Sequence, residues 1–318
     1  MSLYLVTGGA GFIGSNIVEE LIRRQEKVRV LDNFATGKRE NLSHLLDKIE
    51  LIEGDLRNYE LLKEIMSGVD YVLHQAALPS VARSIKEPLL VNEVNITGTL
   101  NILFAAKENK VKRVVYASSS SVYGDTPVLP KKENFYPAPL SPYAVTKLIG
   151  EYYGQVFHNV YGLQTVALRY FNVFGPRQDP ASDYAAVIPR FITLMLAGKS
   201  PTIYGDGLQS RDFTYVDNVV VANLAACTAP QAAGKIINIA CGERIPLIQL
   251  LRDINNIMGT QIIPVFSEAR KGDVKHSLAD IAQAYQLLDY APQIKFKPGL
   301  KKTVEWFKLN YFDKQKSV

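Results

Sequence analysis

The fold is decided near the N-terminus by the stretch Leu3-Tyr4-Leu5-Val6-Thr7-Gly8-Gly9-Ala10-Gly11-Phe12-Ile13-Gly14. Its apolar beginning is typical of a buried β-strand, and an apolar face with helical spacing follows it from Ile13 to Ile22. A second apolar run, Val28 to Leu31, then ends at Asp32. The stretch therefore predicts a βαβ unit with three regularly spaced glycines in its first turn.

The spacing of Gly8, Gly11 and Gly14 predicts a binding site for a dinucleotide. It provides a tight turn, a surface free of side chains for a pyrophosphate, and close packing of the helix on the strand. Asp32 follows Gly14 by 18 positions, where its carboxylate can accept hydrogen bonds from the adenosine ribose hydroxyls. Because that negative charge would repel a 2′-phosphate, we expect NAD rather than NADP.

Further strands are expected at 49–52, 71–74 and 114–117, with helical patterns between them. This alternation predicts an α/β fold with a doubly wound parallel (Rossmann) sheet, whose ligands lie beyond the carboxyl ends of the strands. Two loops should therefore face the cofactor, Asp55-Leu56 and Gln75-Ala76-Ala77. An ordinary structural turn is an equally good explanation for each loop taken alone.

Composition limits the classes of function. At about 150 residues per domain, 318 residues predict roughly two structural units. The net charge is +5 with the basic residues scattered, so nucleic acid is not an expected partner. Two cysteines and four isolated histidines predict neither a disulfide framework nor a metal site. No apolar run approaches the ~18 residues of a membrane span, and no signal peptide is evident, so we expect a cytoplasmic protein without a membrane partner.

A tyrosine and a lysine four positions apart, Tyr143 and Lys147, share one face of a helix that is expected to begin after Leu140-Ser141-Pro142. They follow a run of serines, Ser118 to Ser121, at the carboxyl end of a strand. A phenol with a pKa near 10 becomes a usable base if the lysine ammonium and the nicotinamide charge favour phenolate, while a serine relays the proton. The same spacing at Tyr59 and Lys63 is better explained as a surface pair.

These motifs resemble those of extended short-chain dehydrogenases/reductases. The segments Ser119–Gly124, Leu168–Pro176 and Gly205–Phe213 are similar to those of UDP-hexose 4-epimerases, especially the enzymes that use UDP-N-acetylglucosamine, and the likeness extends to about residue 310. The resemblance implies that Tyr143 removes the proton of the sugar 4-hydroxyl while NAD takes the C4 hydride. The 4-keto sugar then turns over and receives the hydride on its other face. Lys147 would bind the nicotinamide ribose and lower the tyrosine pKa, and Ser119 corresponds to the catalytic serine.

The resemblance also implies the remaining ligands. The expected NAD-binding residues are Gly8, Gly11, Phe12, Ile13, Asp32, Asn33, Gly37, Asp55, Leu56, Gln75, Ala76, Ala77, Tyr143, Lys147 and Tyr170. The expected residues around the UDP-sugar are Ser80, Ser119, Ser120, Ser121, Tyr143, Asn172, Val187, Tyr204, Arg211, Arg270, Asp273 and Ser277. Asn172 would contact the phosphates, Arg211 and Arg270 would clamp the diphosphate with bidentate guanidinium groups, and Asp273 would bind the uridine ribose.

Two positions bear on the reaction and the sugar. Related dehydratases and decarboxylases carry acids where this chain has Ser120 and Ser121, which favours epimerisation. Ser277 stands where a tyrosine closes the space beside C2 in epimerases limited to glucose and galactose. A serine leaves room for an acetamido group, so the expected substrates are UDP-GlcNAc and UDP-GalNAc. The alternatives are UDP-glucose/UDP-galactose, then UDP-glucuronate, and, in a different class, a protein that binds NAD and UDP-sugars without catalysis.

The domain division is expected to be interwoven. Residues 1–171 should form the NAD-binding Rossmann domain, with a returning segment near 219–241 because Ile236–Ala240 has the pattern of a strand. Residues 172–318 should form the UDP-sugar lobe. Helices near 92–109 and 142–160 correspond to the pair that forms a dimer bundle in this family, so we expect a homodimer.

Overall fold

The computed structural model describes residues 1–180, 186–268 and 275–312. Its centre is a seven-stranded parallel sheet, and each strand pairs with its neighbours in one continuous register. In spatial order the strands are β11 (Lys235–Ile239), β6 (Gln164–Tyr170), β5 (Arg113–Ser119), β4 (Tyr71–His74), β1 (Leu3–Thr7), β2 (Lys27–Asp32) and β3 (Glu50–Glu53). The chain order reverses between β1 and β4, which is where doubly wound sheets bind their ligands.

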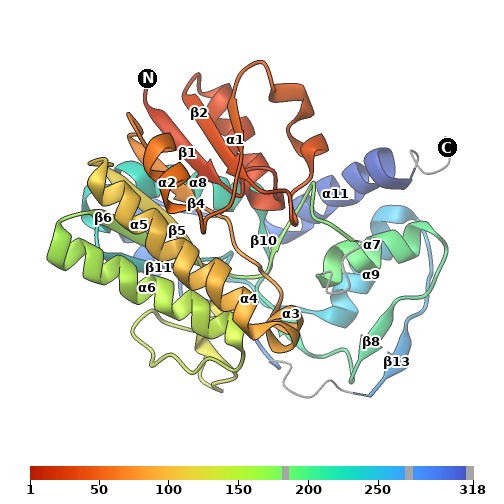
Figure 1. Ribbon diagram of the computed structural model, residues 1–318. Coiled ribbons are helices and arrows are strands. Elements are labelled where there is room, and N and C mark those ends of the chain that lie inside the picture. The colour runs from red at the N-terminus through yellow and green to blue at the C-terminus, as the bar shows by residue number, and fades with distance from the viewer. Residues whose placement is uncertain (181–185, 269–274, 313–318) are drawn as a thin grey trace.

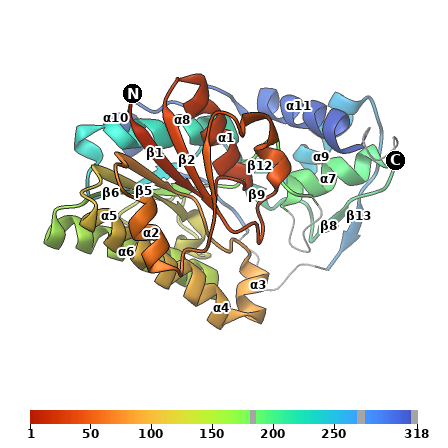
Figure 2. The ribbon, with the colours of Figure 1, turned by 45° about the horizontal axis from the view of Figure 1, so that its top comes forward.

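Helices cover both faces of this sheet, as the predicted α/β class requires (Figure 1). One face carries α1 (Phe12–Arg23), α8 (Val216–Thr228) and α10 (Ala282–Leu288). The other face carries α2 (Tyr59–Ile65), α5 (Gly98–Glu108) and α6 (Pro142–Tyr161). Figure 2 shows the sheet between these two layers. The central strands β1, β4, β5 and β6 are buried on both sides and are therefore mostly apolar, which is why they could be recognised in the sequence.

The predicted return of the chain to the sheet is confirmed. Strand β11 pairs in parallel with β6, from Lys235 opposite Val166 to Ile239 opposite Tyr170. The helix before it, α8, packs its apolar side chains on the same face as α1. Both cysteines are buried and free: Cys227 belongs to α8 and Cys241 follows β11.

A second group of elements lies beyond the carboxyl ends of the strands, at the right of Figure 1, around a core of its own. Its helices are α7 (Val187–Leu196), α9 (Leu247–Met258) and α11 (Phe296–Phe307). Its short strands are β7 (Val173–Phe174), β8 (Thr202–Tyr204), β9 (Ser210–Arg211), β10 (Thr214–Tyr215), β12 (Ile245–Pro246) and β13 (Val265–Ser267). They form three two-stranded pairs, β10 with β7, β12 with β9 and β13 with β8.

The helix expected near 92–109 is present and begins four residues earlier, at Pro88. The run Pro88–Glu108 is a single helical stretch, and by length and composition alone it could cross a membrane. It joins α4 (Pro88–Asn92), a π-helical turn η3 (Glu93–Thr97) and α5. Asn92, Asn95 and Asn101 interrupt the apolar residues in the sequence but do not end the helix. The Asn95 amide bonds to Thr146 of α6 at 3.1 Å, and α5 contributes buried residues to the core below the sheet.

The remaining short elements connect these layers. Helix α3 (Val81–Lys86) precedes α4 near the mouth of the site. Single turns are η1 (Arg39–Asn41), η2 (Ser43–Leu45), η4 (Ser120–Tyr123), η5 (Pro230–Ala232) and η6 (Lys308–Phe312). Of these, η4 matters most for function, because it directly follows β5 and contains two serines of the predicted site.

Candidate active site

The glycine turn has the geometry that the sequence predicted. Gly8 adopts a φ of +68°, in the left-handed region that favours glycine. A Cβ at Gly14 would lie 2.1 Å from the carbonyl oxygen of Gly8, so no side chain fits between the turn and α1. The backbone N–H of Gly8 donates to Leu31 O at 2.8 Å and ties the turn to β2. Phe12 and Ile13 open α1, whose N-terminal N–H groups suit a phosphate.

Asp32 ends β2 beside this turn and is buried. Its Oδ2 accepts from Ala10 N at 2.9 Å and its Oδ1 accepts from Phe34 N at 2.8 Å. A Cβ at Gly37 would lie 2.8 Å from both oxygens, so Gly37 leaves the carboxylate room for a ligand. Burial raises the pKa of Asp32, although these backbone hydrogen bonds oppose the rise. Each carboxylate oxygen can still accept a second hydrogen bond, as a pair of ribose hydroxyls requires.

The other cofactor positions line the same edge. Asn33 Nδ2 donates to Asp55 Oδ2 at 2.9 Å, which joins the loops after β2 and β3, while Leu56 lies buried beneath. Gln75, Ala76 and Ala77 follow β4, and Ala76 lies against Gly8: a Cβ on Gly8 would be 2.8 Å from Ala76 N. The loops after β1, β2, β3 and β4 therefore converge as predicted.

Tyr170 ends β6 within a buried polar cluster. Its hydroxyl donates to Gln75 Oε1 at 3.2 Å and accepts from Asn223 Nδ2 at 2.8 Å. Asn223 Oδ1 in turn accepts from Gln75 Nε2 at 3.0 Å. Asn223 is a residue of α8 that sequence reasoning missed, because a lone asparagine in an apolar helix has no motif around it. It joins two expected cofactor residues from β4 and β6.

The predicted catalytic residues come together at the carboxyl end of β5. Ser119 is the last residue of β5, and its side chain lowers the pKa of Tyr143, which lies near the start of α6. Lys147, one turn later, donates from Nζ to Ala117 O at 2.7 Å and lies 5.9 Å from the centre of the Tyr143 ring. Ser141 begins the helix, since its side chain accepts from Ala144 N. Helix α6 thus presents Tyr143 and Lys147 to Ser119.

The expected effect of Lys147 on Tyr143 is not seen in the chain by itself. Burial raises the pKa of Tyr143 to about 12, and only the Ser119 hydrogen bond opposes the rise. Burial also lowers the pKa of Lys147 to about 7, while the Glu151 carboxylate acts in the opposite direction. Desolvation is the largest cause of both pKa shifts, because it disfavours the charged form of each group. The chain alone holds the phenol in its protonated form.

Ser120 and Ser121 lie in η4, directly after Ser119. Ser121 N donates to Ser119 Oγ at 3.2 Å, which places the two serines against each other. The Ser121 hydroxyl is buried, and the described residues offer it no hydrogen-bond partner. A buried hydroxyl without a partner is costly, so a ligand that reached Ser121 Oγ would satisfy it.

A cleft of about 260 Å³ lies in the second group of elements. Among its lining residues are four predicted substrate residues, Asn172, Val187, Tyr204 and Arg211. Arg190 and Gln209 also line it and were not predicted, since single polar residues between motifs give no signal. Asn172 has a φ of 34° and donates from Nδ2 to Asp212 O at 3.1 Å, which fixes it next to the β9 segment.

Ser277 is held beside this cleft by backbone pairing. Ser277 N donates to Ser210 O at 3.0 Å, and the Ser277 side chain is almost fully buried. Ser80 Oγ accepts from Arg83 N at 3.0 Å as the N-cap of α3, so it has a structural role in the chain alone. Arg270 and Asp273 lie outside the described residues. Within those residues no group of three His, Cys, Asp or Glu could hold a metal ion.

These residues fit a dinucleotide. The turn at Gly8 and Gly14 is closed to side chains, Asp32 can accept from ribose hydroxyls, and the buried Ser-Tyr-Lys set lies at the next strands of the same edge. Fold and site together define a nicotinamide-dependent enzyme of the short-chain dehydrogenase/reductase type.

Comparison with known proteins narrows this class. The family model described as "NAD dependent epimerase/dehydratase family" matches residues 4–240. The chain belongs to that NAD-dependent family and, within it, to the UDP-sugar 4-epimerases.

Three similar proteins illustrate the range of UDP-sugars named for members of this family. A putative UDP-glucose 4-epimerase of Methanocaldococcus jannaschii is 39% identical, over 97% of this chain and 99% of that protein. The structure of a UDP-N-acetylglucosamine 4-epimerase from Methanobrevibacter ruminantium, in complex with UDP-N-acetylmuramic acid, is 44% identical with a TM-score of 0.93, covering 97% and 98% of the two chains. A UDP-glucuronic acid 4-epimerase from Bacillus cereus is 35% identical with a TM-score of 0.91, covering 97% and 100%.

Proposed function

We propose that this protein interconverts UDP-GlcNAc and UDP-GalNAc by epimerisation at C4. The observation that carries the choice of sugar is Ser277, a small residue held beside the cleft by its bond to Ser210. The UDP-N-acetylglucosamine 4-epimerase from Methanobrevibacter ruminantium supports the choice, since it is similar over nearly the whole chain.

The chemistry is assigned to three side chains. Tyr143 takes the proton of the sugar 4-hydroxyl and returns it, and Ser119 holds the phenol through their hydrogen bond. When bound, NAD supplies the oxidation at C4 and its reversal. Lys147 binds the nicotinamide ribose and, when protonated, favours phenolate at Tyr143. Because burial alone gives Tyr143 a pKa of about 12, the proton can leave only when positive charge is held close to the phenol.

Binding of the nucleotide is assigned to the cleft. Arg211 lines it from β9 and is suited to a diphosphate because its guanidinium can bond two phosphate oxygens at once. Asn172 also lines the cleft, and it connects β6 of the sheet to β7 of the second group of elements. The sugar would then extend from the cleft toward Ser119 and Tyr143, where Ser121 offers a buried hydroxyl.

A homodimer is also proposed. Helix α6 exposes an apolar row along its outer face, formed by Val145, Tyr152, Val156 and Val160, of which Val160 is 67% exposed. Phe104 of α5 is exposed beside it. An apolar stripe on two adjacent helices is suited to a matching stripe on a second copy.

The second candidate is UDP-glucose and UDP-galactose, favoured by the relative from Methanocaldococcus jannaschii. A pocket with room for an acetamido group also admits a hydroxyl. UDP-glucuronate ranks third. It requires a cation for the C6 carboxylate, and Arg83 of α3 is already bonded to Glu87 at 2.9 Å.

The purified protein tests this proposal. It should carry NAD and convert UDP-GlcNAc into UDP-GalNAc without added oxidant or reductant, because the cofactor is restored in each turnover. A product lacking the elements of water would identify a dehydratase instead. Retention of NAD with no conversion of any UDP-sugar would favour the non-catalytic alternative.

A further inference from the structure

A buried ion pair lies behind the proposed catalytic residues. Glu151 is on α6, one turn after Lys147, and Arg169 is on β6. Arg169 Nε bonds Glu151 Oε1 at 2.8 Å and Arg169 Nη2 bonds Glu151 Oε2 at 2.7 Å. The two side chains are 2% and 0% exposed, so both charges are removed from water. Neither belongs to the glycine turn or to the cleft.

The pair belongs to a series of bonds between α6 and the end of β5. Three consecutive strand residues interact with α6, each through a different helix residue. Ala117 O accepts from Lys147 Nζ, Ser118 Oγ donates to Glu151 Oε1 at 2.5 Å, and the Ser119 side chain lowers the pKa of Tyr143. The helix partners are spaced four residues apart and therefore share one face.

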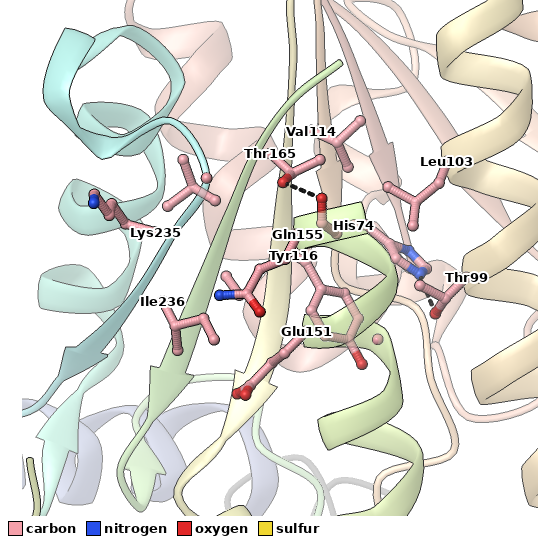
Figure 3. A pocket seen from close by; sticks show the side chains of 15 residues that line it. His74, Thr99, Leu103, Val114, Tyr116, Glu151, Gln155, Thr165, Lys235 and Ile236 are labelled. Atoms are coloured by element: carbon pink, nitrogen blue, oxygen red, sulfur yellow. Dashed lines mark hydrogen bonds between the residues drawn. The ribbon is translucent and has the colours of Figure 1, made fainter. Parts of the chain in front are cut away.

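Neighbouring groups provide further partners for the Arg169 guanidinium. Arg169 also donates from Nη1 to Glu133 O at 3.4 Å, and its guanidinium lies 4.6 Å from the centre of the Tyr123 ring. Gly150, the residue before Glu151, lies directly against the ring of Tyr116. A Cβ at Gly150 would be 2.4 Å from that ring, so only a glycine allows α6 to pack this closely on β5. Figure 3 shows Glu151 and Tyr116 between α6 and the sheet, beside a cavity of about 10 Å³, far too small for a substrate.

Burying such a pair adds little net stability, because the cost of removing both charges from water offsets their attraction. What a bidentate pair does provide is a fixed distance and orientation between its two elements. Here it fixes α6 against β6, at the turn of the helix that follows Lys147.

We propose that Glu151 and Arg169 are positioning residues that hold Tyr143 and Lys147 of α6 in register with Ser119 of β5. The proposal rests on the proposed function, since it assumes that these three residues perform the chemistry. Glu151 does not line the cleft, and it acts through the helix and through its charge, which raises the pKa of Lys147. The resulting geometry is needed in the chemical step, so its loss should reduce kcat and leave KM unchanged.

The informative variant is the double substitution E151M/R169M. E151Q alone would leave the Arg169 charge buried without a partner and would destabilise the fold, whereas apolar replacement of a whole buried pair is often neutral. We expect the double variant to fold, to retain NAD and the wild-type KM for UDP-GlcNAc, and to lose about 100-fold in kcat, the cost of a misplacement of about 1 Å. A folded double variant with kcat within about threefold of the wild type overturns the proposal.

If the double variant does not fold, the variant S118A still tests the proposal. S118A removes one bond to Glu151 and no charge, and we expect about a tenfold lower kcat at unchanged KM, as for loss of a charge-assisted hydrogen bond. Wild-type kcat in S118A overturns the proposal whatever the double variant does. The matched control is R113M, at the other end of β5, where the buried Arg113 bonds Ala226 O and Ala229 O. It should lower the melting temperature and leave kcat unchanged.

Failure of the proposed function would be visible separately. If the wild-type protein converts no UDP-sugar, the assignment of the reaction is wrong. If the wild type is active and S118A or a folded E151M/R169M equals it, the positioning proposal alone is wrong.

Discussion

Tyr143 and Lys147 share one buried environment that acts on them in opposite directions. The enclosed phenol has a pKa raised to about 12, and the enclosed ammonium has a pKa lowered to about 7. In both residues burial disfavours the charged form. At pH 7 the phenol is therefore protonated while Lys147 is close to its own pKa, and positive charge near the phenol would favour phenolate. The motif predicted which residues meet, but their protonation depends on burial, which spacing does not reveal.

Replacing the phenol tests its role as the base. Y143F should reduce turnover by orders of magnitude with little effect on the Kd of UDP, because the ring remains and only the hydroxyl is lost. The matched control is Y59F, in the other tyrosine-lysine pair of the same spacing, where Tyr59 bonds Glu108 at the surface. Steady-state kinetics should show Y59F unchanged. Near-normal turnover in Y143F would exclude Tyr143.

Lys147 gives a pH dependence with a definite sign. Its pKa falls from 10.5 to about 7 on folding, so between those values the unfolded chain binds more protons than the folded chain. Stability contributed by this residue is therefore smallest below pH 7 and rises with pH. In the NAD-free protein, the melting temperature of the wild type minus that of K147M should increase from pH 7 to pH 9. A constant or falling difference would show that Lys147 is not held in a desolvated site.

At the scale of elements, the sequence predicted well where hydrophobic pattern and motif coincide. The strands at Leu3–Thr7 and Tyr71–His74 are confirmed at the predicted residues, and β11 returns to the sheet as expected. The helical run from Pro88 to Glu108 contains the helix expected near 92–109, and only its first turn was not predicted. Glu151 could have been found, since it repeats the four-residue spacing of Tyr143 and Lys147.

The glycine turn offers a prediction at this scale. G14A places a Cβ 2.1 Å from Gly8 O, so the turn must open or α1 must shift. We expect the variant to be purified with little NAD and with a lower melting temperature. The control G154A lies in α6, where a Cβ would meet Thr165 at an ordinary 3.4 Å. Full NAD content in G14A, measured by absorbance after denaturation, would contradict the assigned role of the turn.

At the scale of the whole molecule, the site depends on segments distant in sequence. The catalytic residues come from β5 and α6, whereas the cleft is formed by the segments at 172–174, 186–191, 202–213 and 247. The positions that face the cleft in the described part of the chain include Arg190 and Gln209, which no local pattern indicates. Site residues that belong to a sequence motif could be predicted. Those that reach the cleft only because remote segments pack together could not. The proposed choice of sugar depends on Ser277, which pairs with Ser210 between two residues that line the cleft, Gln209 and Arg211.

The most direct test of the proposed function is a comparison of kcat/KM for UDP-GlcNAc, UDP-glucose and UDP-glucuronate in the wild type and in S277Y. We predict that the wild type prefers UDP-GlcNAc, and that S277Y loses the N-acetylated substrate selectively because the tyrosine fills the space beside C2. Wild-type preference for UDP-glucose or UDP-glucuronate, or equal loss of UDP-GlcNAc and UDP-glucose in S277Y, would contradict the proposed preference.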